Sequence, residues 1–198
     1  MNLENLQKNL TAKGYTVRVF DTAAQAAEYL VESIHGKTVG IGGSMTIDAM
    51  DVYDRLSQDN QVFWHWKTPG PETLAKAAQA QVYLSSVNGI AETGEIINID
   101  GTGNRVAATL NDREKVVFIT GINKVAEDFH QALWRARNIA APLNARRLNR
   151  KTPCALKEEM KCYDCKSPER ICRSLVVLWG PSMSLDTEIV LVDEDLGL

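Results

Sequence analysis

Hydrophobic side chains recur along the chain with two spacings, one typical of helices and one typical of strands. Segments with these two spacings alternate along the sequence. Leu3, Leu6 and Leu10 are three to four residues apart, as on one face of a helix, and Gly14 is a residue that commonly ends one. Residues 15–20 then alternate between apolar and polar side chains, which is the pattern of a strand. The exchange of helical and strand patterns continues through most of the sequence.

The same patterns predict the remaining elements. Helices are expected over residues 22–34 (with Asp21 or Thr22 as the cap), 46–56, 71–80 and 124–138, and strands over 37–41, 61–64, 81–85, 115–120, 174–179 and 188–193. Residues 95–100 and 104–110 flank Gly101-Thr102-Gly103, which predicts an antiparallel hairpin. Alternating strands and helices predict an α/β fold with a mostly parallel sheet flanked by helices.

The length of 198 residues and the ordinary composition predict a single domain over residues 1–198. The first residues contain no apolar signal-peptide core. No window approaches the roughly 18 apolar residues that a membrane-spanning helix requires. We therefore expect a cytoplasmic protein without membrane insertion.

The net charge of −3 is unevenly distributed. Residues 135–173 contain 11 Lys and Arg but four Asp and Glu, so this segment carries +7 and the rest of the chain −10. A basic patch on an acidic body predicts an anionic partner. We expect a small anionic ligand (a hydroxy acid, a sugar phosphate or a coenzyme A ester) and no nucleic acid. The alternative is a solvated basic loop.

All four cysteines lie in that basic segment, at Cys154, Cys162, Cys165 and Cys172. Disulfides that stabilise a fold usually join distant segments, so this clustering argues against that use. Four thiolates brought close together suit a metal ion or an iron–sulfur cluster. The spacing C-x7-C-x2-C-x6-C matches neither bacterial ferredoxins nor typical zinc ribbons. The alternative is four reduced thiols in a loop, and residues 142–173 are expected to form a basic, cysteine-rich insertion.

Three polar stretches follow predicted strands, where open α/β sheets place their ligands. The first is glycine-rich and leads into a helix, so its backbone N–H groups and hydroxyls can attract an anion. The candidate binding residues of the three stretches are Gly42, Gly43, Ser44 and Thr46, then Asn88, Asp100, Asn104 and Arg105, and then Lys124. Glu92 is the candidate catalytic carboxylate. The structural alternatives are a tight turn with Ser44 as helix cap, turns whose polar side chains bind their own backbone, and a solvated lysine.

These stretches resemble the LUD domain (lactate utilisation protein) family. The resemblance rests on residues 39–44, 86–94, 99–106 and 121–125, and it extends from about residue 3 to residue 193. It implies the fold of glucosamine-6-phosphate deaminase, ribose-5-phosphate isomerase and coenzyme A transferases, in which a Gly/Ser-rich loop holds an anion. The better-known members support oxidation of lactate to pyruvate alongside iron–sulfur subunits.

The resemblance therefore implies an accessory protein of 2-hydroxy acid oxidation with iron–sulfur partner subunits, and it favours a 4Fe-4S cluster over zinc at the cysteines. One alternative is a stand-alone enzyme on a sugar phosphate or acyl-coenzyme A, with Glu92 as base or nucleophile. Another is a zinc-stabilised binding subunit without turnover. A homo-oligomer is a further expectation.

Overall fold

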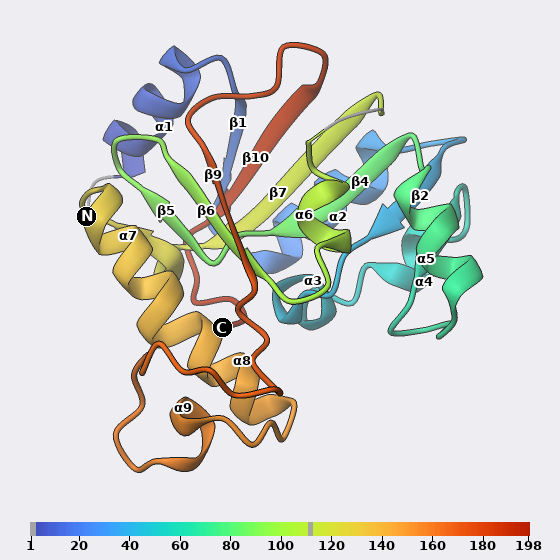
Figure 1. The fold of residues 1–198 in the computed structure, drawn as a ribbon. Coiled ribbons are helices and arrows are strands. Elements are labelled where there is room, and N and C mark those ends of the chain that lie inside the picture. Colours follow the sequence, from blue (N-terminus) through green and yellow to red (C-terminus); the bar gives the residue numbers. More distant parts are fainter. Residues whose placement is uncertain (1–2, 111–112) are drawn as a thin grey trace.

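A six-stranded parallel sheet forms the centre of the computed structural model, which describes residues 3–110 and 113–198 (Figure 1). Its strand order is β1-β10-β7-β4-β2-β3. The strands are β1 (Thr16–Phe20), β2 (Thr38–Ile41), β3 (Gln61–Trp64), β4 (Val82–Ser86), β7 (Lys115–Gly121) and β10 (Asp186–Val192). The mixed α/β architecture with a parallel sheet is the one expected from the sequence.

A second, smaller sheet lies in front of the first and has the order β8-β5-β6-β9 (Figure 1). Its strands are β5 (Gly89–Ala91), β6 (Ile96–Asp100), β8 (Val125–Ala126) and β9 (Ser174–Leu178). β6 pairs antiparallel with both β5 and β9, whereas β5 pairs parallel with β8. The segments that follow β4 and β7 in the chain form strands of this small sheet, which lies over the carboxyl end of the larger sheet.

Helices cover both sheets. They are α1 (Leu3–Ala12), α2 (Ala23–Ser33), α3 (Met45–Ala49), α4 (Tyr53–Leu56), α5 (Pro71–Ala78), α6 (Asn104–Ala107), α7 (Phe129–Arg135), α8 (Ala141–Arg147) and α9 (Pro153–Leu156). A 3-10 turn (Ile122–Lys124) precedes β8, and a π-helical turn (Ala136–Ala140) joins α7 to α8. Thr22 caps α2 with a full capping box, as expected.

The buried side chains form two main layers because successive residues of a strand point to opposite faces. Leu84 of β4 packs with α2, α3 and α4 on one face. Tyr83 and Phe118 point to the other face and pack with α1, α5 and the small sheet. A third cluster, which includes Ala91 and Ala132, joins the small sheet to α7. None of the helices in the described part of the chain has the length and apolar character needed to span a membrane.

The predicted hairpin around Gly101-Thr102-Gly103 is wrong. β6 ends at Asp100, and the chain enters the short helix α6 at Asn104. The Asp100 carboxylate accepts hydrogen bonds from the backbone N–H groups of Thr102, Gly103 and Val106, so it starts a helix instead of a return strand. The antiparallel partner of β6 on its N-terminal side is β5.

Two predicted helices have different bounds. The helix expected over residues 46–56 is divided into α3 and α4, with Asp51 at a positive φ of 49° between them. The helix expected from residue 124 begins at Phe129, where the Asp128 carboxylate accepts a hydrogen bond from the Gln131 N–H. The helical path then continues to Arg147, so residues 142–147 of the expected insertion are helical.

Replacing Leu84 by Ala is expected to lower the free energy of unfolding by about 2–5 kcal/mol, because it leaves a cavity in the fully buried layer beneath α2 and α3. Urea denaturation measures the change. Leu156→Ala is the matched control, since that leucine is 71 % exposed, and it should change the unfolding free energy by about 0.5 kcal/mol or less. Equal losses in the two variants would contradict the assignment of the core.

Candidate anion-binding site

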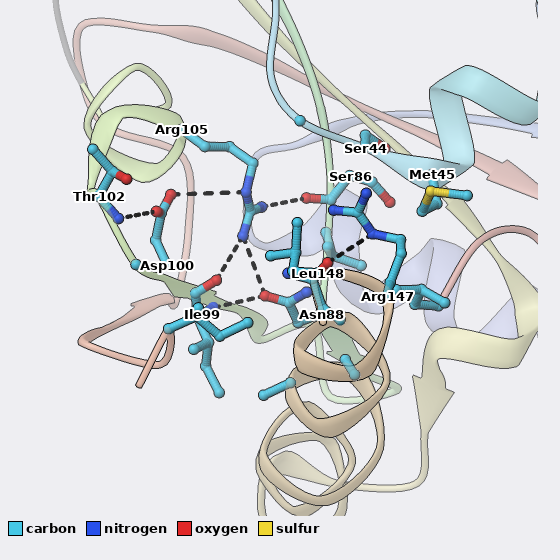
Figure 2. Close-up of a pocket in the computed structure, with 18 of the residues that line it drawn as sticks. Ser44, Met45, Ser86, Asn88, Ile99, Asp100, Thr102, Arg105, Arg147 and Leu148 are labelled. Atoms are coloured by element: carbon cyan, nitrogen blue, oxygen red, sulfur yellow. Dashed lines mark hydrogen bonds and ion pairs between the residues drawn. The ribbon is translucent and has the colours of Figure 1, made fainter. Parts of the chain in front are cut away.

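A cavity of about 260 Å3 opens where the carboxyl ends of β2, β4 and β7 meet the small sheet and α8 (Figure 2). Its walls come from segments far apart in the sequence: Gly43 and Ser44 after β2, Ser86 to Asn88 after β4, Ile99 to Thr102 after β6, Lys124 after β7, and Asn144 to Leu148 on or beside α8. The three polar stretches chosen from the sequence therefore do meet at one site.

Arg105 holds one wall of this cavity together. Its guanidinium donates hydrogen bonds to the Ser86 carbonyl (3.1 Å) and the Asn98 Oδ1 (2.7 Å), and also to the Asn88 Oδ1 (3.2 Å) and the Ile99 carbonyl (2.8 Å). Figure 2 shows most of this fan of contacts around one side chain. The side chain is 13 % exposed. The guanidinium of Arg105 therefore uses its hydrogen bonds to join the end of β4 to β6.

The side chains of Asp100 and Asn88 also make most of their hydrogen bonds within the protein. Asp100 caps α6 and lies 3.8 Å from the Arg105 Nε. The Asn88 Oδ1 accepts from the Ile99 N–H as well as from Arg105. Asn104 lines the cavity at the first residue of α6. Asp100 and Asn88, like Arg105, therefore shape the site chiefly through contacts with their own neighbours.

The glycine-rich loop after β2 has a similar structural explanation. The Gly42 N–H donates to the Leu84 carbonyl, and a Cβ at Gly42 would lie 2.9 Å from the Arg105 Cγ, so only glycine lets Arg105 pass. Ser44 caps α3 by accepting from the Ile47 N–H. Gly43 and Ser44 border the cavity, whereas Gly42 does not line it.

Lys124 has a different environment. It is 3 % exposed, and its Nζ donates to the Thr46 Oγ1 (2.7 Å) and the Ser86 Oγ (3.1 Å), with no carboxylate partner among the described residues. Burial, and to a lesser extent the charges of Arg135 and Arg105, lower the pKa of Lys124 from 10.5 to about 7. Lys124 and Ser86 line the cavity, and Thr46 supports them from behind.

The opposite wall carries cations that were not chosen from the sequence. Arg147 reaches into the cavity from α8, where its guanidinium lies 4.9 Å from the ring of Trp66 and its Nε donates to the Asn144 Oδ1 (Figure 2). Arg150 also lines the cavity. The only advance signal was the basic charge of residues 135–173. His65, which received no role, is a lining residue too, and burial lowers its pKa.

Glu92 is not among the residues that line the cavity. It lies in the turn between β5 and β6, beside α1, where the Asn9 side chain donates to its carbonyl and its own N–H donates to the Ala126 carbonyl. The chemistry of the cavity therefore rests on Lys124, Ser86 and the arginines of its walls.

The four cysteines border a second, much smaller cavity of about 20 Å3 on the other side of α8. The Cys162 Sγ accepts from the Asp164 N–H (3.4 Å) and from Arg137 (3.6 Å), and Arg170 lines the same cavity. Interaction with Cys172 is the main cause of the raised pKa of Arg170. Among the described residues, no group of three or more His, Cys, Asp or Glu side chains lies close enough together to hold a metal ion.

The two cavities share a wall. Ala141 of α8 and Ile171, the neighbour of Cys172, line both of them. The cysteine-bearing segment is anchored beside the larger cavity, because the Arg173 N–H and the Ser174 hydroxyl both donate to the Asp100 carbonyl.

Comparison with known proteins agrees with this architecture. The family model of the LUD domain matches residues 3–192. The chain belongs to the LUD domain family. The match includes the cysteine segment, and it associates the protein with lactate utilisation in general terms.

A solved relative supports the fold. The chain resembles the crystal structure of a DUF162 family protein from Deinococcus radiodurans, with a TM-score of 0.58, 13 % identity, and coverage of 97 % of this chain and 96 % of that one. At this identity the likeness shows the fold of the LUD chain and not its ligand. No curated protein matches the sequence.

Replacing Lys124 by Met is expected to raise the free energy of unfolding at pH 7 by about 1–3 kcal/mol, because a buried amine without an anionic partner costs stability. The pKa of Lys124 is lower in the folded state (about 7) than its ordinary 10.5. The unfolded chain thus binds more protons between these values, and wild-type stability gains from rising pH there. The advantage of the variant should shrink from pH 7 to pH 10.

Chemical denaturation at several pH values measures this difference. Lys8→Met, at an exposed lysine of α1, is the control and should show no such trend. A Lys124→Met variant that is less stable than the wild type at every pH would contradict the unpaired state of this amine.

Proposed function

We propose that the chain binds a small carboxylate or phosphate ligand in the larger cavity, as an accessory protein of 2-hydroxy acid oxidation. The observation that carries this proposal is an excess of positive charge. Asp100 is the sole acidic side chain among the described lining residues, and it is occupied by α6 and Arg105. Lys124, Arg147 and Arg150 line the same space without a carboxylate partner in the described part of the chain.

The size of the cavity favours one class among the expected ligands. A volume of about 260 Å3 is below the range typical of drug-sized ligands, so it suits a hydroxy acid or a small phosphate. The nucleotide part of a coenzyme A ester would have to remain outside. A stand-alone enzyme with Glu92 as nucleophile has less support, because Glu92 does not line the cavity.

In this role the ligand anion would be held between the two walls. Arg147 offers a planar guanidinium already oriented by Trp66 and Asn144, which suits a carboxylate. Lys124 would supply the second positive charge from the sheet side. Arg105 would keep its wall of the cavity rigid without contacting the ligand.

Arg147→Gln is expected to weaken the binding of lactate or phosphate by about ten- to a hundred-fold, since a charged hydrogen bond to an anion is worth about 1.5–3 kcal/mol. Isothermal titration calorimetry at low salt measures the affinity. Arg55→Gln is the control, because Arg55 pairs with Glu28 on the surface and should leave binding unchanged. Unaltered affinity in Arg147→Gln, or no binding of any small anion to the wild type, would contradict the proposal.

We further propose that the cysteine segment holds a metal centre through Cys154, Cys162, Cys165 and Cys172. The donor set is suitable, since all four thiols border one cavity, and Arg137 and Arg170 line it as well. Metal binding requires the thiols to move closer together than they lie here. A 4Fe-4S cluster is the centre implied by the family, but a cavity with room for about one water is better matched to a single zinc ion.

A centre with four thiolate ligands has no open coordination position, so it would support structure or carry electrons. These cysteines would then fix α8 and Ile171, which form one wall of the larger cavity. Iron–sulfur partner subunits and a homo-oligomer also remain part of the proposal.

Cys165→Ser is expected to reduce the metal content of anaerobically purified protein to near zero, because three thiolates and a hydroxyl hold zinc or a cluster poorly. Elemental analysis for zinc and iron, with a visible spectrum for the cluster, measures it. Lys166→Ser changes the exposed neighbour and should keep full occupancy. Wild-type protein that contains neither metal would refute the proposed centre.

A further inference from the structure

Lys124 has features that simple electrostatic binding of an anion would not require. A lysine that stays charged is usually more exposed or is paired with a carboxylate, as Lys115 is with Glu188. Lys124 is almost fully buried and contacts two neutral hydroxyl groups. Burial also favours its uncharged form near neutral pH. An uncharged amine at the wall of a cavity is a nucleophile.

The surroundings of Lys124 supply what an amine needs to react with a carbonyl group. The Ser86 and Thr46 hydroxyls lie within hydrogen-bond distance of the Nζ and 3.1 Å from each other, so they can pass a proton to and from it. Arg147 and Arg150 on the facing wall can hold the carboxylate of the same molecule. A molecule with a carboxylate next to a carbonyl matches both features.

We propose that Lys124 forms a reversible imine with the carbonyl carbon of a 2-oxo acid bound in the cavity. This proposal rests on the proposed function and names a ligand class for the same cavity, because a 2-oxo acid is the product of oxidising a 2-hydroxy acid. The chain would hold the product of that oxidation covalently, and would release it by hydrolysis.

The step balances without an oxidant or a metal. The neutral Nζ attacks the carbonyl carbon and the carbonyl oxygen takes up a proton, which gives a carbinolamine. That proton comes from the attacking amine. The nitrogen then passes its remaining proton through Ser86 or Thr46 to the carbinolamine oxygen, which leaves as water as the C=N bond forms. One water is released per imine, and the reverse addition of water regenerates the amine and the 2-oxo acid.

Borohydride trapping tests the proposal directly. The full chain is incubated with pyruvate or glyoxylate and reduced with sodium borohydride, and the adduct is located by peptide mass spectrometry. We expect one adduct per chain, confined to Lys124. Lactate, which has no keto or aldehyde group, should give no adduct and should compete with pyruvate. Mapping on the wild-type chain makes the result independent of how any variant folds.

Lys124→Arg is the matched variant, because a guanidinium remains a hydrogen-bond donor but does not form an imine. It should lose the adduct, whereas Lys8→Arg, at an exposed lysine, should keep it. Adduct spread equally over exposed lysines such as Lys8 would overturn the imine. Lactate binding without any adduct would overturn the imine alone and leave the proposed function standing. Absence of both binding and adduct would overturn the two together.

Discussion

The guanidinium of Arg105 is the contact on which the site depends. It joins the end of β4 to β6 through the Ser86 and Ile99 carbonyls and the side chains of Asn88 and Asn98. Carbonyl groups at the ends of a parallel sheet would otherwise remain without donors in a partly buried place, which costs free energy. By satisfying them, Arg105 fixes the small sheet over the end of the large one. The cavity is the space left between them.

The strands of the large sheet were predictable because each carries an apolar or alternating pattern, whereas the short strands β5 and β8 were not predicted. Two other errors occurred where a single polar side chain decided the path of the backbone. Asp100 binds three N–H groups and starts α6, so the hairpin pattern around residues 101–103 was misleading. Asp128 sets the start of α7 in the same way. Such local capping is weakly encoded in hydrophobic periodicity.

The site was predictable in part for an equally physical reason. Strand ends of a parallel sheet converge, so the stretches after β2, β4 and β7 could be placed together without a structure. Sequence could not show that Arg105 serves the fold, that Lys124 is buried, or that α8 brings Arg147 across from a distant segment. The shared cavity of the four cysteines likewise depends on how the loop folds against α8.

The central claim is that an anion enters a cavity whose buried amine has a lowered pKa and takes up a proton as the anion binds. Calorimetric titration with lactate at pH 8, in buffers of different ionisation enthalpy, tests it directly. The groups facing Lys124 are the hydroxyls of Thr46 and Ser86 and the charges of Arg105 and Arg135, so an arriving anion should raise the pKa of the amine. His65 also lines the cavity, and the Lys124→Met variant separates its contribution from that of the amine. The account predicts net proton uptake on binding that is larger in the wild type than in Lys124→Met. Binding without proton uptake would contradict it.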